Sequence, residues 1–529
     1  MPTAGNPHPL RRLPRQPSLE QLRKQAKDLL AEYRAGEPAA VEEVQLLKTL
    51  RWWDGFIIAL CNPGFLLGSL GYTLGIFGVV GSMILWGASA AIGMLQAWIY
   101  SEPATMFGNR SGGIALYAHE GWRKYTTLVG PLAAFGYWIG WSVVLSIFGK
   151  IIGDLATSQW WPGSGLSIGF LGNTLTLSSF IAIGCIIFVW AFNIFGLRPA
   201  VWFTYACAAL LMVPLVLFVI VPYFSGHWHG SNVHFHAPGP WGGVKLAIVY
   251  MFILAWSAYG TEACATFAPE YKSIQDTHQA LRRSAMFMLL VCVLLPLGLG
   301  GVNGVNAAVA TGAEGQFYTS AMTTLVGHGA ASFFTICIIA SLLLSMTSST
   351  ADAGRALYGI SRAGMTIKAF GVLSRFHVPA RAMTLDLVVN ILLVLLIKSN
   401  LAILYMSNIG YVLAHVFALS GFLLLRRDRP KWPRPIRIGS AWLPIAAFLC
   451  LINVVFLVVG ALAPKLNGYG TWTDFAIGVG ILFASLLLFI YRRVVEDKEG
   501  VHLREDVPQL PDAAEMQMLT GSPTPVTAG

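Results

Sequence analysis

In the middle of its first long apolar run, the chain reads Cys61-Asn62-Pro63-Gly64-Phe65-Leu66-Leu67-Gly68. Pro63 lacks a backbone N–H and its ring clashes with the preceding helical turn, while Gly64 adopts dihedral angles that other residues avoid. Within a lipid bilayer, backbone N–H and C=O groups must be satisfied inside the protein, so a helix is interrupted only where it lines a cavity. We therefore expect the helix to break at Asn62–Gly64, with free carbonyls on the half before the break and free amides on the half after it.

A second interruption is expected in the sixth long apolar run, whose centre reads Trp256-Ser257-Ala258-Tyr259-Gly260-Thr261-Glu262. A carboxylate inside a membrane is costly and marks a functional site by default. Matching breaks in two halves of a chain indicate a binding site at the midplane of an inverted-repeat transporter. Each break alone could be a simple kink or a packing glycine, but the matched pair favours a site.

The composition excludes a set of soluble domains. Of the 529 residues, 55% are hydrophobic and only 11% are charged, and the mean hydropathy is +0.63, whereas soluble domains carry about 25% charged residues. A helix needs about 20 apolar residues to cross a bilayer. Twelve runs meet this requirement: 52–75, 77–100, 126–151, 176–196, 200–223, 243–268, 284–305, 330–353, 383–400, 402–425, 440–463 and 473–492. The sequence therefore predicts an all-α membrane protein with twelve transmembrane helices.

The basic residues predict how the chain is oriented. With these twelve runs, 31 of the 35 lysines and arginines fall on one side, and only four fall on the other: Lys150, Lys245, Lys398 and Lys465. Cytoplasmic loops carry the excess of Lys and Arg, so we expect a multi-pass protein of the cell membrane with both termini cytoplasmic. The net charge of +10 does not indicate a nucleic-acid partner, because the basic residues are scattered between apolar runs.

Both tails of the chain are polar. Residues 1–51 are expected to form a cytoplasmic tail with an amphipathic helix, whose apolar stripe is Leu19, Leu22, Leu29 and Leu30. Such a helix is either solvated or docked on a surface. Residues 493–529 are polar and contain prolines, and we expect a disordered cytoplasmic tail there.

Four passages carry a family signature. They are the broken run Asn62-Pro63-Gly64; Glu102 followed by Arg110-Ser111-Gly112-Gly113; Gly260-Thr261-Glu262 followed by Glu270-Tyr271-Lys272; and the stretch from Arg355 to Gly364. Together they resemble the amino acid permeases of the amino acid–polyamine–organocation superfamily, in the branch of amino acid, GABA and choline carriers. Two features depart from that pattern: the first run lacks a Gly-Ser-Gly-type turn, and Ala363 replaces the usual Asp.

The resemblance covers residues 50–495 and implies a 5+5 inverted repeat in which helices 1 and 6 are discontinuous around the substrate. The first repeat would be residues 52–223 and the second residues 243–425. Residues 440–492 would form the peripheral helices 11 and 12. The implied function is secondary transport of an amino acid.

An amino acid would need three kinds of contact in such a site. Its carboxylate would bind the amides of the half-helix that follows Gly64, at the positive end of the helix dipole. Its ammonium would bind backbone carbonyls of the second break, near Trp256 and Ser257. The expected substrate-binding residues are Asn62, Pro63, Gly64, Phe65, Tyr137, Trp141, Trp256, Ser257, Tyr259, Gly260 and Glu262. The aromatic members could instead be core residues, or could bind a choline-like head group through cation–π contacts.

A coupling ion is a further expectation. Ser341, Ser345, Ser348 and Asp352 recur on one helical face of the eighth run. In sodium-coupled members of the superfamily, hydroxyls of this helix and carbonyls of helix 1 bind the ion, which makes candidates of Thr347, Ser348, Ser349 and Asp352. The lysine that replaces the ion in some relatives is absent from the fifth run, Pro199–Phe224. Alternatively, Glu262 or Asp352 carries a proton, or the hydroxyls bond their own helix and Asp352 meets Arg355.

Other classes of function are not supported. All seven cysteines lie in apolar runs, which indicates neither disulfides nor a zinc site. The pairs His227/His229 and His234/His236 could bind a metal, but an exposed loop is the simpler interpretation. Enzyme motifs such as a P-loop or H-E-x-x-H are absent from the sequence. We therefore expect a transporter without cofactor or metal, whose partners are an amino acid, sodium or a proton, and the lipid bilayer. The alternatives are a carrier of choline, GABA or polyamine, and an amino acid sensor.

Overall fold

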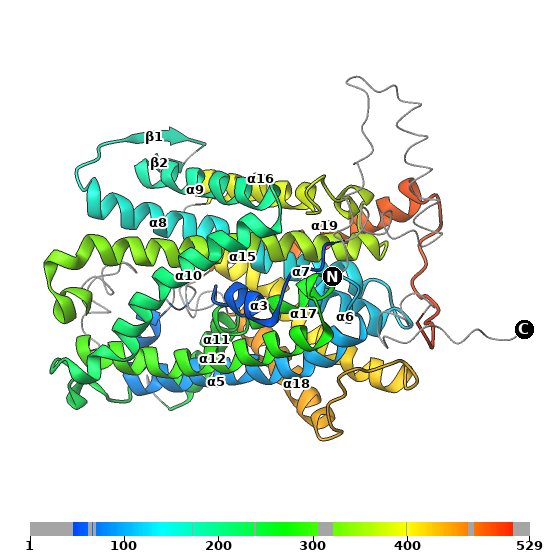
Figure 1. Ribbon diagram of the computed structural model, residues 1–529, viewed down its shortest axis with the longest axis horizontal. Helices are drawn as coiled ribbons and strands as arrows, with labels where there is room; N and C mark the ends of the chain where they lie inside the picture. Colours follow the sequence, from blue (N-terminus) through cyan, green and yellow to red (C-terminus); the bar gives the residue numbers. More distant parts are fainter. Residues whose placement is uncertain are drawn as a thin grey trace, which may run out of the picture.

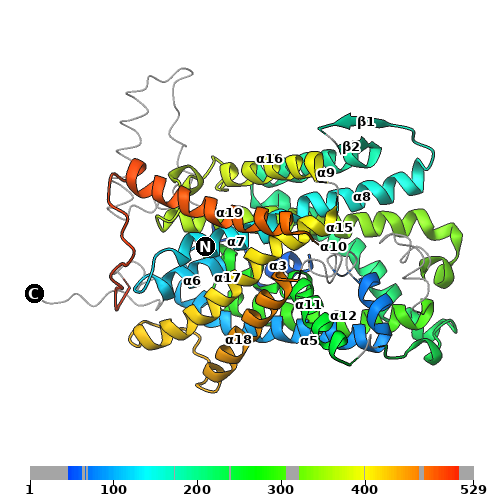
Figure 2. The same cartoon turned by 180° about the vertical axis from the view of Figure 1, so that it is seen from behind.

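The computed structural model describes residues 46–61, 66, 70–171, 173–236, 240–304, 321–397, 399–463 and 470–511 (Figure 1). The longer helices run side by side along the long axis of the molecule (Figures 1 and 2). In chain order they are α3 (Trp52–Ala59), α5 (Leu70–Met106), α6 (Gly113–Trp122), α7 (Val129–Ser142), α8 (Val144–Trp160), α9 (Leu177–Ile194), α10 (Leu197–Val219), α11 (Pro240–Ala258), α12 (Ile274–Asn303), α15 (Ala331–Arg362), α16 (Ala380–Leu396), α17 (Asn400–Asp428), α18 (Trp442–Ala461) and α19 (Trp472–Tyr491).

The prediction of a helical membrane protein is confirmed. Within the described residues, ten helical segments are long and apolar enough to cross a bilayer. Two expected runs are not among them. The run 52–75 is represented by α3 and the beginning of α5, and the run 383–400 forms α16, which has 17 residues.

A sharp turn at Gly78, close to the boundary between the first two expected runs, lies inside the continuous element α5. The backbone of Gly78 has φ 68° and ψ −177°, which is not helical. A Cβ atom at this position would lie 2.6 Å from the carbonyl oxygen of His234. Only glycine satisfies both the positive φ and this close approach. The loop with the two His-x-His pairs therefore packs against the turn, where His236 N donates to Phe77 O at 3.1 Å.

Several helices extend beyond the predicted runs because their polar ends are capped or buried. The α12 helix begins ten residues before the predicted position, at Ile274, where the Ser273 hydroxyl accepts from Asp276 N. The α15 helix continues past residue 353 to Arg362, because Asp352 and Arg355 are buried there against other segments. A short antiparallel hairpin, which the sequence analysis did not predict, joins α8 to α9 through β1 (Ser167–Phe170) and β2 (Asn173–Thr176).

The loops rich in Lys and Arg gather at one end of the helices, opposite the β1–β2 hairpin (Figure 1). We call the end formed by residues 107–128, 363–379, 426–440 and 492–511 the basic end. Buried Glu102 is held here by Arg426, Arg434 and the backbone of Ile438, at 2.5, 3.0 and 3.0 Å. Residues 492–509 also make hydrogen bonds and ion pairs with the other three segments of this end. The disordered tail that the sequence predicts covers residues 493–529, and these contacts concern the part of it that the structure describes, up to residue 511.

Two helices at the basic half approach α17 so closely that glycine is required on both sides. A Cβ atom on Gly410 of α17 would lie 2.6 Å from Cα of Gly136 on α7, and one on Gly121 of α6 would lie 2.5 Å from Cα of Gly421. Membrane helices pack closely where small residues let their backbones meet. These glycine pairs position α7 and α17, whose inner faces carry side chains of the site described below.

The first prediction concerns this packing. Gly410→Val should destabilise the protein by about 1–3 kcal/mol or more, because overpacking forces the backbones apart. The control is Gly480→Val on α19, where a Cβ atom would have no neighbour within 4 Å. Thermal unfolding in detergent measures the effect. Equal midpoints for the two variants would contradict the packing described here.

Candidate functional site

The first expected break lies outside the described residues, which leave out Asn62, Pro63, Gly64 and Phe65. The described residues just before this break show how the chain approaches it. The α3 helix ends at Ala59, and Cys61 is fully buried. The Cys61 carbonyl accepts a hydrogen bond of 2.7 Å from the Ser345 hydroxyl on α15. A backbone carbonyl before the predicted break is therefore satisfied by another helix.

The second expected break coincides with a change of helix type. The α-helix α11 ends at Ala258, Gly260 has φ 5° and ψ −15°, and a 3₁₀-helix, η3, follows over Thr261–Glu270. A 3₁₀ stretch within a helix often marks a functional hinge. The last carbonyls of an α-helix have no partners within it, and here they lie in the interior, because Ser257 and Tyr259 are buried. The Ser257 hydroxyl has no hydrogen-bond partner among the described residues.

The four aromatic candidates are all buried beside this change of helix type. Trp256 donates its indole N–H to the Gly140 carbonyl on α7 at 2.7 Å. The ring of Tyr137 lies 6.2 Å from Trp141, on the same helix, and 6.1 Å from Tyr411 on α17. Trp256 therefore joins α11 to α7, while Tyr137 and Tyr259 both face α17.

Glu262 lies at the centre of a buried polar cluster. Its Oε1 accepts from the Tyr411 hydroxyl at 2.6 Å and lies 3.7 Å from Nε2 of His415. Nδ1 of His415 lies 3.0 Å from the Tyr100 hydroxyl, and its ring packs edge-on against Tyr259 at 5.2 Å. Sequence reasoning did not single out Tyr411 and His415 as site residues. An ionisable residue in the middle of an apolar run, one turn from a tyrosine, was the signal that could have found His415.

The hydroxyl candidates on α15 have different environments. Thr347 donates its hydroxyl to Leu343 of its own helix at 2.8 Å, which is the local bonding considered as an alternative. The hydroxyls of Ser348 and Ser349 are buried and have no partner among the described residues. Ser345, rather than Thr347, is the residue that contacts the carbonyl of Cys61.

Asp352 and Arg355 do not form the ion pair considered as an alternative. Asp352 accepts a hydrogen bond from the Thr266 hydroxyl on η3. Arg355 instead pairs with Glu270, with one contact from Nε to Oε2 and another from Nη2 to Oε1 at 2.8 Å. Both side chains of this pair are almost fully buried. Three carboxylates of η3 and α15 therefore occupy the interior, and within the described part of the chain only Glu270 has a paired arginine.

The basic end of the site is closed by polar contacts between distant segments. Glu270 O accepts from Thr49 N and Leu50 N at 2.9 and 2.8 Å, so η3 is tied to the chain just before α3. The Ser111 hydroxyl lies within 2.9 Å of Thr266 O and 3.2 Å of Arg355 O. Together with the Arg355–Glu270 pair, these contacts join η3 to α15 and seal this end below Glu262. Among the described residues, no group of three or more His, Cys, Asp and Glu side chains could hold a metal ion.

Comparisons with known proteins identify the family. The family model described as "Amino acid permease" matches residues 50–486. The chain is 23% identical over 420 residues to "Uncharacterized amino acid permease YvbW" of Bacillus subtilis (strain 168), covering 73% of this chain and 88% of that one. It is 21% identical over 427 residues to the "Gamma-aminobutyric acid permease" of the same organism, covering 76% of this chain and 84% of that one. The chain therefore belongs to the amino acid permease family and is a membrane transporter of amino acids, not an enzyme.

Proposed function

We propose that this permease is a secondary active transporter that moves an amino acid across the cell membrane by alternating access. Twelve spans would form two inverted five-helix halves, residues 52–223 and 243–425, with two peripheral helices, and the basic end would face the cytoplasm. The observation that carries this proposal is the end of α11 at Ala258, inside the membrane, next to the buried carboxylate of Glu262. A helix end and a carboxylate at this depth are costly unless a polar ligand uses them.

The recognition of the substrate would follow from the two breaks. The amides after Gly64 would bind the carboxylate of the amino acid. The carbonyls at the end of α11, and the unpartnered hydroxyl of Ser257, would bind its ammonium group. The buried rings of Tyr137, Trp141, Trp256 and Tyr259 would enclose the side chain, with Phe65 and Gly260 completing the site. One relative is named as a γ-aminobutyric acid permease, so an ω-amino acid of that kind is the second candidate substrate.

A proton is the coupling ion that the buried cluster favours. Among the described residues, neither Glu262 nor Asp352 forms a salt bridge with a lysine or arginine. An unpaired buried charge is strongly unfavourable, so such a carboxylate either takes up a proton or meets a cation. His415, whose Nε2 lies 3.7 Å from Glu262 Oε1, is a neighbouring ionisable side chain to which a proton could pass. Sodium bound by Ser348 and Ser349 is the alternative.

The second prediction tests this coupling. Glu262→Gln keeps the size of the side chain and a hydrogen bond to Tyr411 but cannot carry a proton. Uptake driven by a pH gradient should fall about tenfold or more, because the variant lacks a group that acts during turnover. The measurement is accumulation of labelled amino acid in proteoliposomes, with sodium equal on both sides. Undiminished accumulation by the variant, or uptake that follows a sodium gradient instead, would contradict proton coupling through Glu262.

The third prediction concerns the closure of the basic end. Glu270→Gln should destabilise the protein by about 3–5 kcal/mol, because it leaves the buried charge of Arg355 without its partner. The matched control is Glu499→Gln, which removes a carboxylate whose side chain is 60% exposed. Thermal unfolding of both variants measures the difference. Equal unfolding temperatures for the two variants would contradict a stabilising role of the Glu270–Arg355 pair.

The direct test of the function is counterflow in proteoliposomes. Purified protein is first screened by thermal shift against amino acids and amines, since a ligand that prefers the folded state raises its melting temperature. The ligand with the largest shift is then loaded inside the vesicles, and labelled ligand is added outside. A transporter concentrates the label transiently. A sensor with the same fold would bind the ligand but would not exchange it.

A further inference from the structure

The segment that follows α19 is fastened along the basic end of the molecule. It begins with a short π-helix, η6 (Arg492–Glu496), and continues past the loop between α6 and α7. Thr127 N donates to Leu503 O at 2.9 Å, and the Thr127 hydroxyl donates to His502 O at 2.8 Å. Glu505 N donates to Arg123 O at 2.9 Å. We call residues 492–505 the strap.

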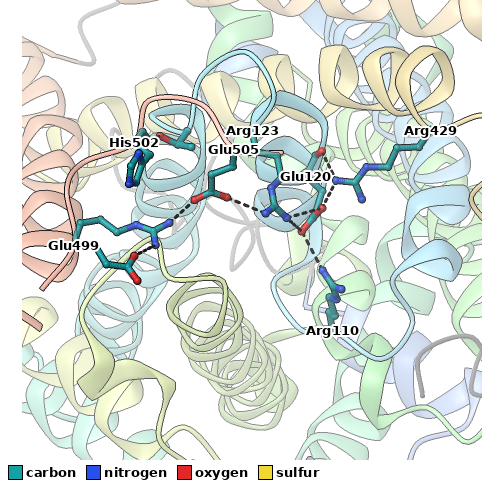
Figure 3. A network of polar contacts seen from close by, with 9 residues as sticks. Arg110, Glu120, Arg123, Arg429, Glu499, His502 and Glu505 are labelled. Carbon is teal, nitrogen blue, oxygen red and sulfur yellow. Dashed lines mark hydrogen bonds and ion pairs between the residues drawn. The ribbon is translucent and has the colours of Figure 1, made fainter. Parts of the chain in front are cut away.

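Charged side chains reinforce this backbone pairing (Figure 3). Glu505 pairs with Arg493 of the strap itself and lies 2.9 Å from Nη2 of Arg123. Arg123 in turn lies 3.3 Å from the carboxylate of Glu120 on α6. An unbroken series of ion pairs therefore runs from the strap to α6.

Glu120 is the fixed centre of this network. It also pairs with Arg429 at 2.5 Å and with Arg110 at 3.0 Å, and its side chain is only 2% exposed. Burial alone would raise the pKa of Glu120, but Arg429 and the neighbouring His119, Arg123 and Arg110 lower it to about 2. Because its pKa is depressed, the ionised carboxylate stabilises the fold at pH values above its ordinary pKa of 4.5. This stabilisation is lost only as the pH falls towards 2. The centre therefore stays charged at physiological pH.

A second anchor ties the strap to the loop that follows α15. Lys368 Nζ lies 2.8 Å from Asp497, and Lys368 N donates to the Glu496 carboxylate at 2.7 Å. Arg492 donates to Thr366 O at 3.3 Å and pairs with Asp497 at 2.7 Å. The strap therefore bridges the loop after α15 and the loop before α7.

The α6 helix connects the strap to the closure of the basic end. It begins at Gly113, whose φ is +51° and where a Cβ atom would lie 2.6 Å from Cγ2 of Thr266 on η3. The preceding Ser111 hydroxyl bonds Thr266 O. The same hydroxyl lies 3.2 Å from Arg355 O on α15, so η3 cannot separate from α15 without displacing the start of α6 or breaking these contacts. The strap holds the other end of α6 through Arg123.

The ion pair that joins the strap to Arg123 is more exposed than the ion pair between Glu120 and Arg429. The side chains of Arg123 and Glu505 are 21% and 19% exposed, whereas those of Arg429 and Glu120 are 1% and 2% exposed. Partly exposed ion pairs contribute little and are screened by salt. Salt should therefore release the strap while the Glu120–Arg429 pair remains intact.

We propose that the strap is a regulatory latch that restrains the opening of the basic end and is released when the ion pair between its Glu505 and Arg123 is screened or removed. The inference rests on the alternating-access function proposed above, in which η3 must move away from α15. The strap makes no described contact with Glu262, Asp352 or the aromatic residues of the site, so it would act on the opening and not on substrate binding.

The test uses a native cysteine as a reporter of opening. Cys264 lies on η3 and is fully buried while this end is closed. The full chain is reconstituted in vesicles and treated with N-ethylmaleimide at about 0.1 M and about 1 M salt, where the screening length falls from about 10 Å to about 3 Å. The rate of Cys264 alkylation is read by mass spectrometry of its peptide. Glu505→Lys is compared with Glu499→Lys, a charge reversal at a residue whose one described ion pair is a 3.8 Å contact with Arg493.

At low salt, Cys264 should react several-fold faster in the Glu505→Lys variant than in the wild type or the Glu499→Lys control. At high salt, the wild type should approach the rate of Glu505→Lys. Equal rates for the two variants at low salt would overturn the latch. Counterflow measured on the same vesicles separates the two proposals. Strap-dependent labelling without amino acid exchange would refute the transport function alone, and exchange with strap-independent labelling would refute the latch alone.

Discussion

The satisfaction of backbone polar groups inside a bilayer is the constraint on which the rest of this molecule depends. The α11 helix ends at Ala258, among buried residues, and a 3₁₀-helix takes over after Gly260. On the neighbouring first run, the carbonyl of Cys61 is received by the hydroxyl of Ser345. Lipid offers no hydrogen-bond partner for such groups, so surrounding helices must provide the partners, together with a polar ligand in the transport cycle that we propose. The close glycine contacts of α7 with α17 bring those helices near enough to do so.

Three buried carboxylates also need polar partners inside the protein, and each finds a different one. Glu270 is neutralised by Arg355, which makes it a structural member of the closure. Asp352 accepts a hydroxyl from Thr266, and Glu262 accepts one from Tyr411 beside His415. Hydroxyls stabilise a carboxylate less than an arginine does. Glu262 and Asp352 are therefore the carboxylates that we propose to meet a proton, an ion or the ammonium group of a substrate.

The features that the sequence predicted depend on local pattern. Long apolar runs gave the helices, and Gly260 next to an intramembrane Glu262 gave the position at which α11 ends. The features that it missed depend on partners from distant segments. The Ser345 hydroxyl meets the carbonyl of Cys61, Arg355 pairs with Glu270, and His415 lies beside Glu262 from another helix. Spacing along one helix shows which residues share a face, but not which neighbour that face meets.

The same dependence on distant partners explains why the contacts of the strap could not be predicted from the sequence. A polar segment with prolines has no apolar pattern of its own and looks disordered, although complementary charges on Arg123 and Lys368 hold it in place. Such complementarity between a tail and two distant loops cannot be recognised until the helices have brought those loops to one end. The basic residues that predict orientation in the membrane thus also form the contacts that fasten the tail.

The central claim is that the substrate binds where the first and sixth runs are interrupted, and protection of Cys61 tests it most directly. Cys61 immediately precedes Asn62-Pro63-Gly64. Its alkylation by a small maleimide is followed by mass spectrometry during turnover, with and without a saturating amino acid that the protein exchanges. The account predicts that this amino acid slows the modification of Cys61, while an amino acid that is not exchanged has no effect. Equal modification with and without the exchanged amino acid would contradict a binding site at this position.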